Sequence, residues 1–157
     1  MKNFFLVLFF LINSSLIFSQ EYEFTGLLKL NKTTIISYHL AFTERDGKIS
    51  GQSITDLGGD NETKNKIEGF YNKKTNEFSF TEKNIIYSKS KIVTNDFCYL
   101  SYTSKLKLTE KQKKISGKFK SFFKDGKACL NGEIDLIEFK KAQKKIHKMN
   151  SKIQNSK

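Results

Sequence analysis

The sequence predicts an all-β domain, an eight-stranded antiparallel up-and-down barrel, between an apolar leader and a basic amphipathic helix. Three observations support it: apolar and polar residues alternate through most of the chain, short turns separate the alternating runs, and glycines recur inside them. A β-sandwich is the alternative, because it shares the alternation. Short sequential turns and glycines that allow tight coiling favour the closed barrel.

Residues 1–20 have the order of a secretory signal peptide. Lys2 precedes an apolar run, Phe4–Leu11, and a small residue and a charged segment close the leader. The polar triplet Asn13–Ser15 interrupts the run before the roughly 20 apolar residues that a spanning helix needs. We therefore expect cleavage before Gln20 or Glu21, a secreted or periplasmic protein, and no transmembrane span after cleavage. A retained amphipathic anchor is the alternative.

Residues 21–139 form the expected barrel domain. In the second alternating run, Ile36, Tyr38, Leu40 and Phe42 share one face, as in a strand with one buried side. Asp-Gly pairs at 46–47 and 125–126 are typical of hairpin turns. In chain order, the expected strands are 22–30, 36–43, 49–57, 63–72, 77–87, 97–108, 115–123 and 128–139.

Glycines recur in similar places inside the expected strands, each after an Ile-Ser, Ile-Glu or Leu-Asn pair: Gly51, Gly69, Gly117 and Gly132. Strands of a small closed barrel must coil tightly, and glycine permits the kinks that this needs. Asp46–Gly51, a Gly-bearing loop and then Ile67–Tyr71 resemble the strand 2 to 4 region of avidin-type barrels and, more loosely, the lipocalin and fatty-acid-binding barrels. The resemblance implies architecture only. Avidin-type barrels hold biotin against several tryptophans, and this chain has none.

The two cysteines, Cys98 and Cys129, are expected to form a disulfide, since an exported protein meets an oxidising compartment. Closing a loop of about 30 residues would stabilise the fold by roughly 3–4 kcal/mol. Their strands should flank the seventh strand at a separation of about 10 Å. A disulfide spans at most about 7 Å between Cα atoms, so one cysteine must lie at a strand end or bulge. Two free thiols are the alternative.

The net charge of +12 comes mainly from residues 140–157, which contain seven lysines and no acidic residue. Phe139, Ala142, Ile146, Met149 and Ile153 are spaced by three or four residues, which predicts one apolar helical stripe over 139–153. The basic tail could contact an anionic envelope surface or a partner protein, or the helix could dock on the barrel while its lysines keep the surface soluble. The candidate contact residues are Lys140, Lys141, Lys144, Lys145, Lys148 and Lys152.

Signals for catalysis or metal binding are few. His39 is expected to be an ordinary surface or lumen residue, since no nucleophile motif accompanies it. The carboxylates and glycines of residues 56–62 could suit Ca²⁺, but they also suit a plain loop. We expect no catalytic residue, no cofactor and no metal. Four carboxylates fall inside expected strands and either enter the lumen or face water beside lysines: Glu68, Glu82, Glu133 and Asp135.

The leading functional hypothesis is a non-enzymatic binding module that holds one small apolar or mixed ligand in the lumen. A cell-envelope structural or interaction protein that uses the basic tail is the alternative, and a hydrolase of unrecognised type is a third reading. Nucleic acid is not an expected partner of an exported protein. A lumen fully packed by five phenylalanines would rule out the lumen ligand: Phe24, Phe42, Phe78, Phe80 and Phe119.

Overall fold

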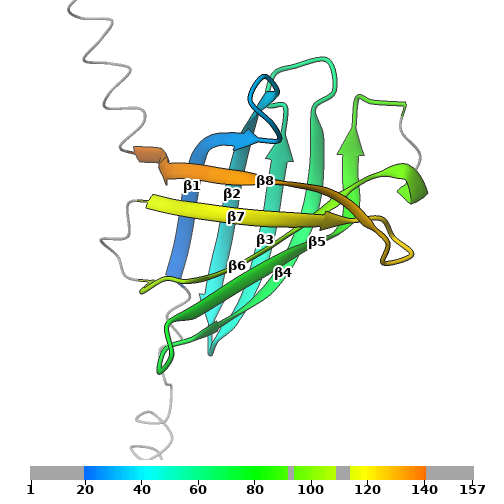
Figure 1. The fold of residues 1–157 in the computed structure, drawn as a ribbon. Helices are drawn as coiled ribbons and strands as arrows, with labels where there is room; N and C mark the ends of the chain where they lie inside the picture. The colour runs from blue at the N-terminus through cyan, green and yellow to red at the C-terminus, as the bar shows by residue number, and fades with distance from the viewer. Residues whose placement is uncertain (1–19, 92–93, 109–113, 141–157) are drawn as a thin grey trace, which may run out of the picture.

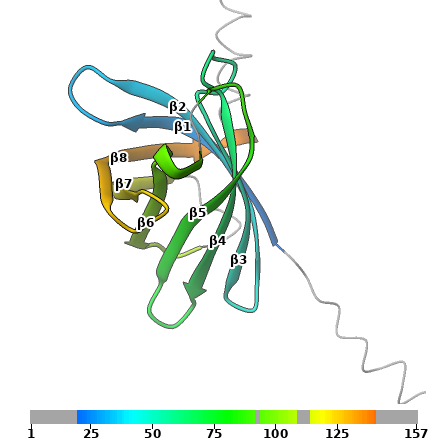
Figure 2. The same cartoon turned by 90° about the vertical axis from the view of Figure 1, so that its right-hand side faces the viewer.

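The computed structural model describes residues 20–91, 94–108 and 114–140 as a closed barrel of eight antiparallel strands (Figure 1). Each strand pairs with its neighbours in the chain, and β1 closes the barrel against β8. In both views β7 and β8 cross the opposite wall at a steep angle (Figure 2). The strands are β1 (Gln20–Lys29), β2 (Ile35–Arg45), β3 (Lys48–Thr55), β4 (Thr63–Asn72), β5 (Glu77–Ser88), β6 (Tyr99–Lys105), β7 (Lys114–Phe122) and β8 (Ala128–Glu138).

The all-β prediction and the closed barrel are confirmed, and the sandwich alternative is excluded. The sixth strand is shorter than the predicted 97–108. The Leu106 amide still donates to the Asn76 carbonyl beside the pair Glu77 and Lys105, and the chain then leaves the ladder, where the Leu108 amide donates to the Tyr71 hydroxyl. The predicted signal peptide, except Gln20, and the predicted helix beyond Lys140 lie outside the described residues. Within the described part, no helix has the length and apolarity to cross a membrane.

The barrel has two ends that differ in their connections. The hairpin end carries the β2–β3 and β4–β5 turns, and the loop end carries the β1–β2, β3–β4, β5–β6 and β7–β8 connections. Asp46 and Gly47 have φ angles of 52° and 82°, which confirms the expected tight turn at the hairpin end. Gly51 follows in β3, where a Cβ atom would lie 2.6 Å from the Phe42 Cα. The glycine therefore permits the close approach of β2 and β3.

Aromatic side chains fill the lumen from the hairpin end to its middle. The ring centroids of Phe42 and Phe78 are 5.5 Å apart, those of Phe78 and Phe80 5.9 Å, and those of Phe80 and Tyr102 5.7 Å. Rings in this range attract one another beyond the gain from burial alone. The five phenylalanines predicted for the lumen are exposed by 3% or less: Phe24, Phe42, Phe78, Phe80 and Phe119.

The predicted disulfide joins Cys98 to Cys129 at the loop end, with their Cα atoms 5.8 Å apart. Cys98 precedes the first residue of β6, and Cys129 is the second residue of β8. The expected position at a strand end is confirmed. The β7–β8 register also shifts between Lys120 and Phe122, just beside the bridge. The bridge closes the rim over β7 and the turn that follows it.

Candidate functional site

A polar cluster occupies the lumen at the loop end. Its members come from four consecutive strands, β2 to β5, and every one of them is buried. Each member faces inward because it shares strand parity with buried apolar neighbours, as Glu82 does with Phe78 and Phe80. The polar cluster consists of Tyr38, Ser53, Asn65 and Glu82.

The Glu82 carboxylate is the centre of the polar cluster. Its Oε1 accepts hydrogen bonds from the Tyr38 hydroxyl at 3.0 Å and from the Ser53 hydroxyl at 2.6 Å. Its Oε2 accepts one from the Leu100 backbone amide at 2.9 Å. Within the described residues, no lysine, arginine or histidine forms an ion pair with it. Three hydrogen bonds thus replace a counter-ion.

Glu82 lies where β5 separates from β6. The β5–β6 ladder ends at the pair Thr81 and Ser101, while β5 itself continues to Ser88. The β4–β5 register also shifts twice in this region, as β-bulges produce. The Leu100 amide therefore lacks a partner on the β5 backbone, and the Glu82 side chain supplies one.

Asn65 has neither hydrogen-bond donor nor acceptor satisfied. Its side chain is 0% exposed, and neither Oδ1 nor Nδ2 has a hydrogen-bond partner of good geometry among the described residues, although the amide lies near enough to Glu82 to lower the pKa of that carboxyl. An unpaired buried polar group costs about 1–3 kcal/mol. Such an amide is normally paired with protein, water or ligand. A group that both donates and accepts, such as a hydroxyl or an amide, matches it.

Burial sets the electrostatics of the polar cluster. Removal from water raises the pKa of Glu82, although the hydrogen bonds from Leu100, Ser53 and Tyr38, and then the neighbouring Asn65 amide, oppose that rise. Burial, and then the charge of Glu82, raises the pKa of Tyr38 well above its usual value. Tyr99 follows the same pattern, with burial and Glu82 raising its pKa. The cluster can therefore hold a proton on Glu82 or accept hydrogen bonds from a polar guest.

A second buried carboxylate, Glu44, lies at the hairpin end and differs from Glu82. Its Oε1 accepts from the Gly47 amide at 2.8 Å, and its Oε2 lies 3.4 Å from the Lys73 ammonium. Glu44 thus fastens the β2–β3 turn to the β4–β5 turn. It is paired with a cation, so it has a structural role that the Glu82 carboxylate does not share.

The other carboxylates predicted within strands face outward. Glu68 lies 2.8 Å from Lys66, and Asp135 lies 3.0 Å from Lys114. Glu133 is exposed. Of these four carboxylates, only Glu82 enters the lumen. Sequence reasoning missed Asn65, although its alternation with the buried Ile67 already placed it on the inner face.

His39 lies on the outer face of the barrel. Its Nε2 is 3.3 Å from the Glu23 carboxylate, and its ring meets the Phe139 ring edge-on, with centroids 5.3 Å apart. Its Nδ1 is buried and has no partner among the described residues. His39 and the polar cluster therefore lie on opposite faces of β2, so the structure does not combine them into one site.

In the loop of residues 56–62, two carboxylates accept hydrogen bonds from the loop's own backbone amides. Asp56 accepts from the Asn61 amide at 3.0 Å, and Glu62 accepts from the Gly58 amide at 2.6 Å. Lys89 lies 3.7 Å from Glu62. Among residues 20–91, 94–108 and 114–140, no three His, Cys, Asp or Glu side chains gather as metal ligands.

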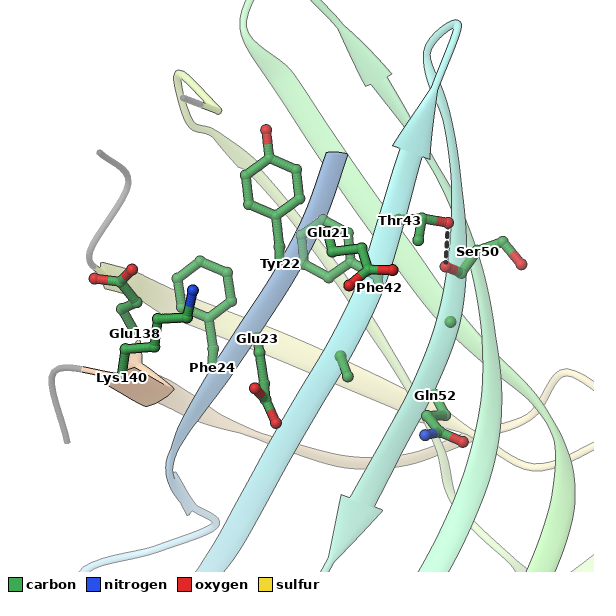
Figure 3. Close-up of a pocket in the computed structure, with 12 residues that line it drawn as sticks. Glu21, Tyr22, Glu23, Phe24, Phe42, Thr43, Ser50, Gln52, Glu138 and Lys140 are labelled. Carbon is green, nitrogen blue, oxygen red and sulfur yellow. Dashed lines mark hydrogen bonds between the residues drawn. The ribbon is translucent and has the colours of Figure 1, made fainter. Parts of the chain in front are cut away.

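An outer groove of about 730 Å³ lies over β1, β2 and β3. Ala41, Thr43 and Ser50 form its floor, and the Thr43 hydroxyl donates to the Ser50 carbonyl at 3.3 Å. Glu138 and Lys140 lie beside β1, on the side away from β3 (Figure 3). Among the predicted contact lysines, Lys140 is described and lines this groove, while those beyond it lie outside the described residues. Glu21, Glu23 and Gln52 complete its polar lining.

Comparison with known proteins identifies no relative: no family model, curated protein or solved structure matches this chain.

Proposed function

We propose that the protein is an exported, non-enzymatic binding module that holds one small ligand of mixed character at the loop end of its lumen. The observation that carries the proposal is Asn65, whose buried amide has no hydrogen-bond partner among the described residues and lies on the inner face with Glu82. A ligand bearing a hydroxyl or amide group would satisfy Oδ1 and Nδ2 together.

The aromatic part of the lumen is not part of this proposal. Its five phenylalanines are almost completely inaccessible, so the protein's own side chains fill that space. An apolar ligand in that part would have to displace packed rings. The ligand site is therefore confined to the polar end, beyond the last β5–β6 pair, Thr81 and Ser101.

Export is supported by the disulfide and by the signal-like leader. A Cys98–Cys129 bridge is suited to an oxidising compartment. The order of residues 1–20 is that of a cleaved signal. We place the protein outside the cytoplasm, either secreted or periplasmic. Pulse-labelled cells fractionated with and without a blocked export pathway test this location, because a shorter chain should appear only when export proceeds.

The binding proposal is tested by nuclear magnetic resonance with three probes of similar shape. Benzamide and benzyl alcohol carry the required polar group, and toluene does not. Millimolar benzamide or benzyl alcohol should shift the Asn65 side-chain amide and the Leu100 backbone amide, while toluene should leave both unchanged. Failure of both polar probes to move the Asn65 amide contradicts the proposal, as does an equal response to toluene.

Asn65→Leu provides the matched variant for this test. Leucine has a similar volume and no polar atoms, so the fold should lose little stability or gain some when an unpaired amide is removed. The polar probes should no longer bind. A variant that folds normally and still binds benzamide would show that Asn65 is not the recognition group.

A further inference from the structure

The outer groove is acidic, and among the described residues no lysine or arginine forms an ion pair with its carboxylates. Glu21, Glu23 and Glu138 line it against a single cation, Lys140. Within the described residues, neither Glu21 nor Glu138 forms an ion pair, and the ion pair of Glu23 is with His39. The two glutamates of β1 stand on either side of Tyr22 and point to the same outer face (Figure 3).

The chain leaves the barrel at this groove. β8 ends at Glu138 beside β1, and Phe139 packs edge-on against His39 on the outer face. Lys140, the last described residue, itself lines the groove. The following segment therefore starts within reach of Glu21 and Glu23.

The segment that begins there, residues 141–157, has a positive charge that complements the glutamates of the groove. Residues 141–157 contain six lysines, 141, 144, 145, 148, 152 and 157, and no acidic residue. The apolar stripe predicted from the sequence starts at Phe139, which already contacts the outer face through His39. Small floor residues, Ala41, Thr43 and Ser50, leave space of about 730 Å³ above the sheet.

We propose that residues 141–157 dock in the outer groove of the same molecule, with their lysines opposite Glu21 and Glu23. The segment is tethered at Lys140, so docking needs only weak ion pairs and apolar contact at a high effective concentration. The docked tail covers His39 and neutralises the carboxylates of β1. Residues 141–157 thus bind their own barrel, and their lysines become available to other anionic surfaces only after release from the groove. The proposal does not depend on the lumen ligand.

A carbodiimide reagent tests the proposal, because it joins carboxylates to lysine amines that are in direct contact. In the full chain at low salt, peptide mapping should find links from Glu21 or Glu23 to lysines of residues 141–157. The links should form within monomers and should not depend on protein concentration. High salt should suppress them, since charge screening shortens from about 10 Å at 0.1 M to about 3 Å at 1 M.

Two double variants make the result specific. Glu21→Gln with Glu23→Gln removes both linking carboxylates, so links at these positions should be lost, and the hydrogen-exchange protection of the tail should fall about threefold, as the loss of two exposed ion pairs predicts. Glu77→Gln with Glu133→Gln changes two exposed glutamates outside the groove and should leave the tail links unchanged. Tail links spread evenly over all exposed carboxylates would overturn the proposal.

Hydrogen exchange supplies the second readout. Amides of residues 141–157 should be protected in the protein alone and less protected in the Glu21→Gln, Glu23→Gln variant. Vesicles of phosphatidylglycerol should compete with the groove rather than be required for protection. Protection that appears only with these vesicles would show that an anionic membrane, and not the groove, is the partner of the tail.

Discussion

The two halves of the lumen share one alternation of inward-facing residues but are built from different chemistry. Towards the hairpin end, Phe42, Phe78 and Phe80 contact one another and leave almost no accessible surface. At the loop end, Glu82 accepts three hydrogen bonds and Asn65 makes none. The aromatic half thus stabilises the barrel by packing, whereas the polar half contains a buried carboxylate without a cation partner and a buried amide without a hydrogen-bond partner among the described residues.

The two buried carboxylates, Glu44 and Glu82, also differ between the two ends of the lumen. Glu44 binds a turn amide and lies 3.4 Å from Lys73, so the protein supplies its counter-ion. Glu82 has hydrogen bonds but no cation partner among the described residues. Buried carboxylates without a counter-ion are unusual unless they are neutral or await a partner. This contrast is the reason why the ligand site is proposed at the loop end.

The largest expected effect is the loss of an aromatic ring from the packed half. Phe78→Ala should destabilise the barrel by about 3–5 kcal/mol, because it removes a fully buried ring and leaves a cavity. Phe70→Ala, a matched change at a half-exposed outer position, should cost far less. Urea unfolding of both variants measures the difference. Similar small losses for both would contradict a tightly packed aromatic half.

The next effect concerns the disulfide at the loop end. Replacing Cys98 and Cys129 together by serine should lower the free energy of unfolding by about 3–4 kcal/mol, since the bridge closes a loop with a sequence separation of 31. Hydrogen exchange should then rise first around β6 and the start of β8. An unchanged unfolding midpoint, or faster exchange confined to the hairpin end, would be incompatible with this role.

A smaller effect is expected on the pH dependence of stability, in which the buried Glu82 should differ from an exposed carboxylate. Burial raises the pKa of Glu82 in the folded state, so ionisation is less favourable folded than unfolded. Stability from this group is greatest below the unfolded pKa and falls as pH rises through the folded pKa. Glu82→Gln removes the titration, so its stability relative to the parent should increase as pH rises across that window.

Glu68→Gln is the control with the opposite sign. Lys66 lowers the pKa of the exposed Glu68, so its contribution is present above the unfolded pKa and is lost as pH falls through the folded pKa. Its variant should therefore lose stability relative to the parent at higher pH. Parallel pH curves for Glu68→Gln and Glu82→Gln would mean that Glu82 is not buried as described.

Alternation and turn chemistry predicted the barrel and all eight strands, because both depend on local sequence. The same alternation placed Phe78, Phe80 and Glu82 on one face, but it did not show which carboxylate entered the lumen. That choice depends on the separation of β5 from β6, which leaves the Leu100 amide for Glu82. The outer groove also depends on tertiary structure, since β1 and β8 are far apart in the chain but adjacent in space.

The central claim is that the polar end of the lumen, through Asn65, receives a guest. A crystal structure of the protein soaked with benzamide tests it most directly. We expect the benzamide amide within hydrogen-bond distance of Asn65 Oδ1 and Nδ2, with the packing of Phe42, Phe78 and Phe80 unchanged. A ring bound among those phenylalanines, or Asn65 paired only with protein atoms or a fixed water and no benzamide beside it, would contradict the account.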